Sequence, residues 1–145
     1  MSTLDDTVHR VATPDTLARE FHRLPGTLAC AARARGLLGR FLHRLGRTDL
    51  ADSAQLVVSE LVANAVEHGL PPVDLTMTWL TDGHPTLRVD VCDHGLSGAL
   101  PAVQTPADEA ESGRGLLLVE HVTDRWGVAP HPVTGTHAWA ELRTA

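Results

Sequence analysis

The sequence predicts an α+β protein, a two-layer α/β sandwich in which helices cover one face of a mixed, mostly antiparallel sheet. Two patterns carry this prediction. Apolar residues recur every three or four positions at 28–45 and 49–68, which is typical of amphipathic helices. They recur at every second position at 73–80 and 86–92, which is typical of half-buried strands. The short turn between these strands, with Asp-Gly as its strongest signal, indicates an antiparallel pair.

The N-terminal part is expected to hold a leader, a short strand and the first helix. Residues 1–18 are polar and show no sustained period, so we expect a flexible leader. Residues 19–24 read as a short strand. We expect Thr27 to cap the helix at 28–45 and Gly46 to follow its last residue. Two glycines inside this helix would let another element, such as a second subunit, approach closely: Gly36 and Gly39.

The second helix, at 49–68, has clear start and stop signals. Thr48 or Asp49 can serve as its N-cap, and Gly69 stops it before a pair of prolines. Its apolar residues alternate in steps of four and three, so this stripe is expected to face the core: Leu50, Ala54, Val57, Leu61 and Ala65.

The C-terminal part is expected to complete a single domain over 19–145. The period vanishes from 93 to 113, a stretch rich in glycine, proline and acidic residues, and a loop of that length is either functional or disordered. A helix is predicted from 113 to about 124. Residues 125–128 and 136–143 then read as a closing hairpin.

The composition argues against several classes of protein. A formal net charge of −6 disfavours binding to a nucleic-acid backbone, which requires a clustered positive surface. Cys30 and Cys92 form no CxxC pair and the nine histidines form no HExxH motif, so we expect neither a disulfide nor a zinc site. No apolar run approaches the roughly 18 residues of a membrane helix, and the N-terminus lacks a signal pattern. We expect a cytoplasmic protein.

The helix at 49–68 also carries a polar face that packing does not explain. Glu60 and Asn64 are one turn apart, Glu67 lies close to Glu60 around the helix, and His68 lies at the edge of this face. In an isolated helix the simplest interpretation is a solvated face. Glycine-containing turns further along the chain favour a functional site instead.

Those turns are Asp93-His94-Gly95, at the end of a strand, and Gly113-Arg114-Gly115, at the start of a helix. With the polar face of the helix at 49–68, in this order, they resemble the Bergerat ATP-binding fold of gyrase, heat-shock chaperones, histidine kinases and mismatch-repair ATPases. Within that group the chain is most similar, over about 17–143, to the bacterial anti-sigma-factor serine/threonine kinases. The phrases that carry the likeness are Val58-Ser59-Glu60-Leu61-Val62-Ala63-Asn64-Ala65, His68-Gly69, Ser112-Gly113-Arg114-Gly115-Leu116-Leu117-Leu118-Val119, Asp124-Arg125-Trp126-Gly127 and Trp139-Ala140-Glu141-Leu142.

The resemblance implies ATP and Mg²⁺ as cofactors and assigns roles on the helix. Asn64 matches the asparagine whose amide oxygen holds Mg²⁺, an ion that binds through few protein groups together with phosphate oxygens. Glu60 matches the glutamate taken as the catalytic base, which orients or deprotonates an attacking hydroxyl. The family pattern gives Glu67 no role.

The remaining matches concern the nucleotide itself. Asp93 resembles the aspartate that accepts a hydrogen bond from the exocyclic amine of adenine, which guanine cannot donate there. Gly95 would let the backbone approach the base, and Thr136 matches a hydroxyl that supports the adenine contact. The phosphates would meet the backbone and the cation at the start of the third helix, formed by Gly113, Arg114, Gly115 and Leu116.

The chain departs from the family pattern in the expected ATP lid, at about 96–113. Ser97 stands where the family's first glycine box often has its second glycine. The lid also carries three carboxylates, which would repel phosphate unless they point outward: Asp108, Glu109 and Glu111.

Two activities fit the resemblance. The first is an ATP-dependent serine/threonine protein kinase that phosphorylates an anti-sigma-factor antagonist in a partner-switching pathway. The second is a nucleotide-binding regulatory module with little or no kinase activity, and an interaction domain without nucleotide is a third class. A histidine kinase core is disfavoured because one helix precedes 49–68, and a gyrase-like ATPase would need a transducer domain. The implied partners are a sigma factor, its antagonist or both, without direct nucleic-acid or membrane binding; a homodimer is left open.

Overall fold

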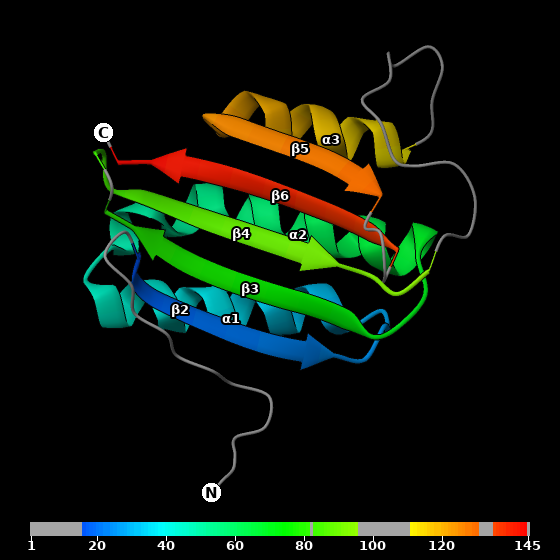
Figure 1. The fold of residues 1–145 in the computed structure, drawn as a ribbon. Coiled ribbons are helices and arrows are strands. Elements are labelled where there is room, and N and C mark those ends of the chain that lie inside the picture. Colours follow the sequence, from blue (N-terminus) through cyan, green and yellow to red (C-terminus); the bar gives the residue numbers. More distant parts are fainter. Residues whose placement is uncertain (1–15, 82, 96–110, 131–134, 145) are drawn as a thin grey trace, which may run out of the picture.

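The structure, a computed structural model, describes residues 16–81, 83–95, 111–130 and 135–144. Its helices are α1 (Cys30–Leu45), α2 (Ala51–His68) and α3 (Glu111–Val122), with a 3-10 turn, η1 (Thr48–Leu50), before α2 (Figure 1). Its strands are β2 (Thr16–Leu24), β3 (Val73–Leu80), β4 (Thr86–Cys92), β5 (Arg125–Pro130) and β6 (Thr136–Arg143). None of the helices in these ranges is long and apolar enough to span a membrane.

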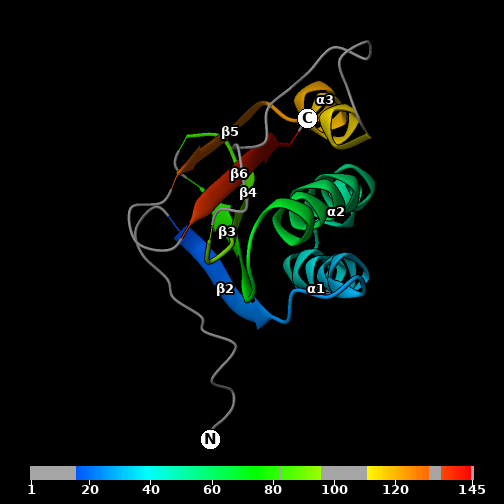
Figure 2. The ribbon, with the colours of Figure 1, turned by 90° about the vertical axis from the view of Figure 1, so that its right-hand side faces the viewer.

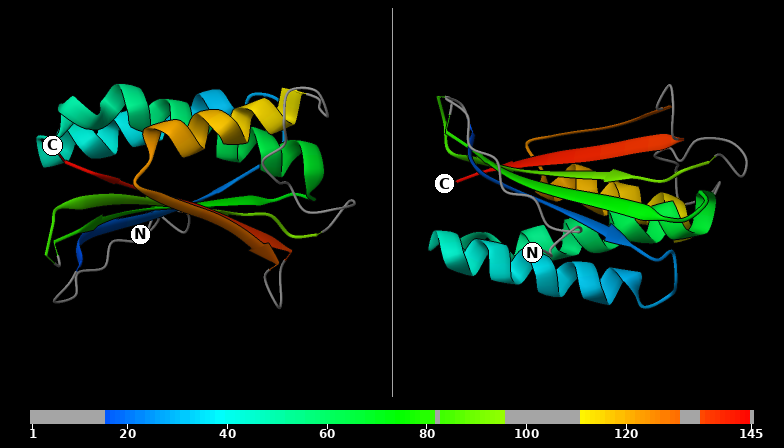
Figure 3. Two further views of the ribbon diagram at one scale, coloured as in Figure 1. Left: turned by 90° about the horizontal axis from the view of Figure 1, so that it is seen from above. Right: turned by 60° about the horizontal axis from the view of Figure 1, so that its bottom comes forward.

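The described strands form one sheet in the order β2-β3-β4-β6-β5. Figure 2 shows the three helices against one face of this sheet, with α2 between α1 and α3, and Figure 3 shows the same layering from two other sides. The predicted α+β sandwich with helices on one face is confirmed. The predicted sheet is mixed, whereas each pairing between described strands is antiparallel.

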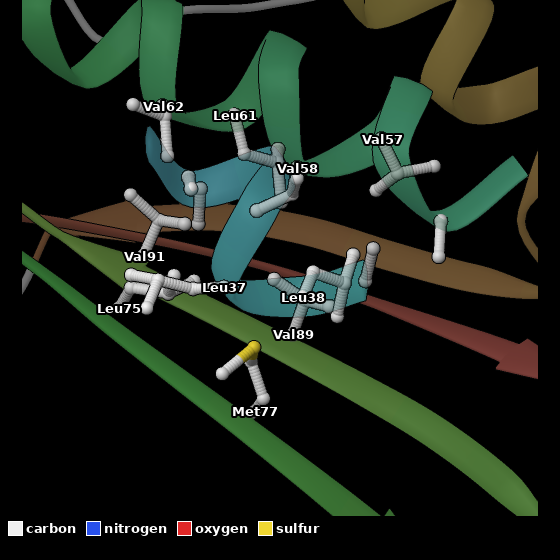
Figure 4. Packing of buried hydrophobic residues seen from close by; sticks show 14 of the residues in the cluster. Leu37, Leu38, Val57, Val58, Leu61, Val62, Leu75, Met77, Val89 and Val91 are labelled. Carbon is white, nitrogen blue, oxygen red and sulfur yellow. The ribbon is translucent and has the colours of Figure 1, made fainter. Parts of the chain in front are cut away.

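The core lies between the helices and the sheet. Buried side chains of α1 and α2 meet those of β3 and β4 (Figure 4), and this layer includes Leu37, Leu38, Val57, Val58, Leu61, Val62, Leu75, Met77, Val89 and Val91. Burial of one such side chain contributes roughly 1.5–3 kcal/mol, so this layer holds α2 firmly over the sheet. The predicted inner stripe of α2 is buried except for Leu50, which lies in η1 before the helix begins.

The predicted side-chain caps of the first two helices are wrong. α1 begins beyond Thr27, and this residue contributes only its carbonyl oxygen, which accepts a hydrogen bond from the N–H of Cys30 at 3.0 Å. α2 begins beyond Thr48 and Asp49, which lie in η1. The Asp49 carboxylate does not cap a helix because it accepts a hydrogen bond from Arg47 at 2.8 Å.

Other boundaries differ by a few residues. β2 begins at Thr16, so the predicted leader overlaps the strand, and residues 1–15 lie outside the described ranges. α3 begins at Glu111, before the predicted start at Gly113. The prediction of a lid at 96–113 and the departure at Ser97 fall almost wholly on residues outside the described ranges, as do two of the lid carboxylates, Asp108 and Glu109.

A cluster of polar side chains lies between β2 and α1. Glu20 and His22 are 5% and 6% exposed, and Arg44 of α1 forms an ion pair with Glu20. Burial lowers the pKa of His22 below its usual 6.5, and the charges of Arg33 and Arg40 on α1 lower it further. His22 is therefore neutral in the folded protein at a pH where it is already protonated in the unfolded chain.

We expect the free energy of unfolding to fall as the pH drops below 6.5, because the unfolded chain then takes up the His22 proton more readily than the folded protein. The variant His22→Gln removes this difference and should lose less stability on acidification. Urea unfolding at about pH 7.5 and about pH 5.5 measures the effect. The exposed His43→Gln on α1 serves as control, and equal pH dependence in both variants would contradict the prediction.

Candidate functional site

A small hollow lies at the end of the sheet where α2 ends, β4 ends and β6 begins, the right-hand end in Figure 1. Its lining comes from these elements: Leu61, Asn64, Ala65, Val91, Asp93, Thr136 and Ala138. Its volume is about 10 Å³, close to the room that one water molecule needs, so this recess can admit one small polar group and no more. The structure thus brings together Asn64, Asp93 and Thr136, which the sequence places far apart.

Asp93 is held rigidly at the end of β4. Its side chain is 3% exposed, and Oδ1 accepts hydrogen bonds from the backbone N–H groups of Thr136 at 3.1 Å and Gly95 at 3.2 Å. The N–H of Asp93 donates to the carbonyl oxygen of Thr136 at 3.0 Å. Because both backbone donors use Oδ1, the other carboxylate oxygen, Oδ2, is the one suited to accept a hydrogen bond from a ligand.

Two glycines make room for this carboxylate, and the sequence interpretation gives them no such role. A Cβ atom on Gly69 would collide with the Asp93 side chain, and one on Gly135 would lie 2.5 Å from Asp93 Oδ1. The backbone of Gly135 also has a φ of 155°, which residues with a side chain rarely adopt. Glycine at the end of a helix or in a hairpin is common, so no sequence signal distinguishes these two from ordinary turn residues.

Asn64 faces the same hollow from α2. It is 7% exposed, and its Nδ2 atom is buried without a hydrogen-bond partner among the described residues. A buried polar atom without a hydrogen bond lowers the stability of the fold by about 1–3 kcal/mol. A rotation of the carboxamide group exchanges the positions of its oxygen and nitrogen atoms, so the oxygen can take the position of Nδ2. Such a side chain fits a role as ligand for a hard cation, since Mg²⁺ takes one or two protein oxygens and completes its shell with phosphate and water. The described residues contain no group of three or more His, Cys, Asp or Glu that would hold a metal by itself.

Glu60 lies one turn before Asn64 on α2, outside the lining of the hollow. The side chain is partly buried, and this burial raises the pKa of Glu60 above its usual 4.5. A carboxylate with a raised pKa is a stronger base than a solvated one. The side chain of Glu67 is 60% exposed, and its Oε1 atom lies 3.6 Å from Nε2 of His68. This exposure fits the interpretation of Glu67 as a solvated carboxylate.

The residues predicted to meet the phosphates lie in the first turns of α3, at the same end of the sheet as the hollow (Figure 1). The first four N–H groups of a helix have no partner within it, and Gly113 and Arg114 fall among these four, whereas Gly115 follows them. The side chains of 111–115 lie outside the described part of the structure, so the role of Arg114 stays a prediction. Leu116 is 1% exposed and packs in the core, so it could meet a nucleotide only through its backbone.

Comparison with known families identifies a match. The profile of the histidine kinase-like ATPase domain matches residues 24–139, which include the hollow, both polar residues of α2 and the start of α3. No curated protein matches the chain.

Proposed function

The chain belongs to the histidine kinase-like ATPase domain family, and from this premise we propose that it is an ATP-dependent serine/threonine protein kinase acting on an anti-sigma-factor antagonist. Family membership supports ATP binding and a regulatory role. One observation of the structure carries the proposal further. The buried Asp93, whose Oδ1 is held by two backbone N–H groups, lies in one recess with Asn64, whose buried Nδ2 atom has no hydrogen-bond partner among the described residues.

The described residues can divide the work of binding as follows. Oδ2 of Asp93 accepts a hydrogen bond from the exocyclic amine of adenine, which selects adenine over guanine. Asn64 supplies an amide oxygen to Mg²⁺, which would neutralise charge on the phosphates when bound. The N–H groups of the first turn of α3, which have no partner within the helix itself, favour phosphate oxygens nearby.

We assign Glu60 a role toward the acceptor rather than toward the nucleotide. In the transfer, the hydroxyl oxygen of a serine or threonine bonds to the γ-phosphorus, and the bond from this phosphorus to the β,γ-bridging oxygen breaks. ADP leaves with that electron pair, and Glu60 accepts the hydroxyl proton. Its burial supports this role, because burial raises the pKa of the Glu60 carboxyl group above that of a solvated glutamate and makes the carboxylate a stronger base.

A protein partner is supported by the surface beside α2. An apolar groove of about 410 Å³ runs between the start of α1 and the end of α2, lined by Thr27, Leu28, Ala31, Ala63, Val66 and Glu67. Leu28 is 96% exposed. Exposed apolar surfaces of this kind are typical of protein interaction sites, and this one lies on the helix that carries Glu60.

A second candidate is a nucleotide-binding regulatory module with little or no kinase activity. Glu60 lies outside the recess that holds Asn64, Asp93 and Thr136, and nucleotide binding alone would not need this carboxylate, so the same recess also fits a module without transfer. Incubation with labelled ATP and candidate antagonist proteins distinguishes the two. Label on the antagonist supports the kinase, and nucleotide binding without transfer supports the module.

The nucleotide site is tested by titration calorimetry with ATP and GTP, with and without Mg²⁺. We expect the wild type to bind ATP in preference to GTP and to bind more tightly with Mg²⁺. We expect Asn64→Ala to lose the Mg²⁺-dependent part of the affinity, about tenfold or more, because an ion–ligand oxygen is removed. Thermal unfolding without nucleotide checks that the variant folds, and an unchanged response to Mg²⁺ would refute the role of Asn64.

A further inference from the structure

The residue between Asp93 and Gly95 takes part in a chain of contacts that the proposed function does not use. The His94 ring is directed away from the recess: its Nε2 atom lies 2.9 Å from Oδ2 of Asp74 on β3. Asp74 in turn accepts two hydrogen bonds from Arg23 on β2, at 2.8 and 2.9 Å. Side chains of three neighbouring segments are therefore joined, from the edge strand of the sheet to the turn after β4.

Asp74 has the least exposed side chain in this chain of contacts, and that of Arg23 is 53% exposed. The side chain of Asp74 is 14% exposed, and that of His94 is 23% exposed. Burial raises the pKa of Asp74, but hydrogen bonds and charges from Arg23 and His94 outweigh burial and hold this pKa below its usual value. Asp74 is thus ionised at neutral pH, and it lies opposite Cys92, the last residue of β4, in the sheet register.

The backbone of the same turn is held from the other side. The N–H of His94 donates to the carbonyl oxygen of Leu70 at 2.9 Å. Gly95 packs so closely on Leu70 that an added Cβ would lie 2.5 Å from a methyl group of that side chain. The turn is therefore fixed by Leu70 through its backbone and by Asp74 through the His94 ring.

Asp93 and His94 are adjacent in this turn, and the N–H of Gly95, which donates to Oδ1 of Asp93, belongs to the peptide group that follows His94. The placement of His94 therefore bears directly on the geometry of the Asp93 carboxylate. We propose that His94, held by Asp74 and Arg23, is a positioning residue that aims the Asp93 carboxylate at the base of the nucleotide. This inference rests on the proposed function, because it assumes that Asp93 reads the base. His94 itself touches no nucleotide; it fixes the peptide groups on which the geometry of Asp93 depends.

The test compares ATP and GTP affinities, by calorimetry with Mg²⁺, of the wild type, His94→Ala, His94→Gln and His84→Ala. In His94→Gln the side-chain amide nitrogen can take the place of Nε2 and donate to Asp74. His84 is an exposed histidine at the other end of the sheet whose ring contacts the carbonyl oxygen of Thr144 at 2.8 Å, so its variant is a matched control. Thermal unfolding without nucleotide reports any loss of fold.

We expect His94→Ala to lower the ratio of ATP to GTP affinity about tenfold, because the Asp93 carboxylate is then no longer held in one orientation. His94→Gln and His84→Ala should keep the wild-type ratio. A selectivity change is diagnostic, since a general loss of stability would weaken both nucleotides alike. An unchanged ratio in His94→Ala, or an equal loss in His94→Gln, would overturn the positioning role. If the wild type itself fails to prefer ATP, the proposed function fails instead, and the two results are thereby distinguished.

Discussion

Replacement of Glu60 by glutamine is expected to slow phosphoryl transfer to the antagonist by about 10²–10⁴-fold while leaving ATP affinity nearly unchanged. The amide cannot accept the hydroxyl proton, but it is similar in size to the carboxylate and Glu60 lies outside the recess that holds Asn64 and Asp93. Single-turnover transfer from labelled ATP measures the rate, and calorimetry measures the affinity. This pair of measurements separates a catalytic role from a role in binding.

The matched control is Asp52→Asn, which changes an exposed carboxylate in the first turn of the same helix, outside the apolar groove between α1 and α2. It should transfer phosphate at the wild-type rate. The pH dependence gives a second check. A solvated glutamate titrates near pH 4.5, but burial raises the pKa of Glu60. On acidification, the transfer rate should therefore begin to fall at a pH higher than 4.5. Equal rates for Glu60→Gln and wild type would eliminate Glu60 as the base and favour the regulatory module.

Asp93→Asn is expected to weaken ATP binding by about 10- to 100-fold, since a hydrogen bond to a charged group contributes about 1.5–3 kcal/mol. In the folded protein Oδ1 is held by the N–H groups of Thr136 and Gly95, so the amide oxygen of the variant should take that position. The new NH₂ group then replaces Oδ2. It would meet the amine of adenine donor to donor, whereas it can donate to the carbonyl oxygen of guanine.

The ratio of ATP affinity to GTP affinity should therefore fall by a larger factor than the ATP affinity alone, because the GTP affinity should rise. Calorimetry with both nucleotides tests this, with Asp90→Asn as the control. Asp90 lies earlier on β4, where it accepts hydrogen bonds from Arg88 and His137 rather than from the turn after the strand. Retained ATP selectivity in Asp93→Asn would show that another group reads the base.

Local patterns predicted most of the secondary structure, because each depends on a backbone repeat that neighbouring residues express directly. The strands at 73–80, 86–92 and 136–143 have the predicted bounds. Gly46 has the positive φ of 72° expected of a residue that follows a helix. The helix starts were wrong where a side chain had a competing partner, as Asp49 has in Arg47, since a cap is one weak hydrogen bond among several alternatives.

The candidate site divides in the same way. The sequence alone determined that Glu60 and Asn64 share one face of a helix, since helical geometry fixes their spacing, and it singled out Asp93 by its place at a strand end. Only the tertiary structure decided that Asp93 and Thr136 hydrogen-bond to each other and that the ring of His94 contacts Asp74. It also decided that Gly69 and Gly135 leave room for the Asp93 carboxylate. These contacts join segments far apart in the chain, and sheet order and packing, which no local repeat encodes, bring them together.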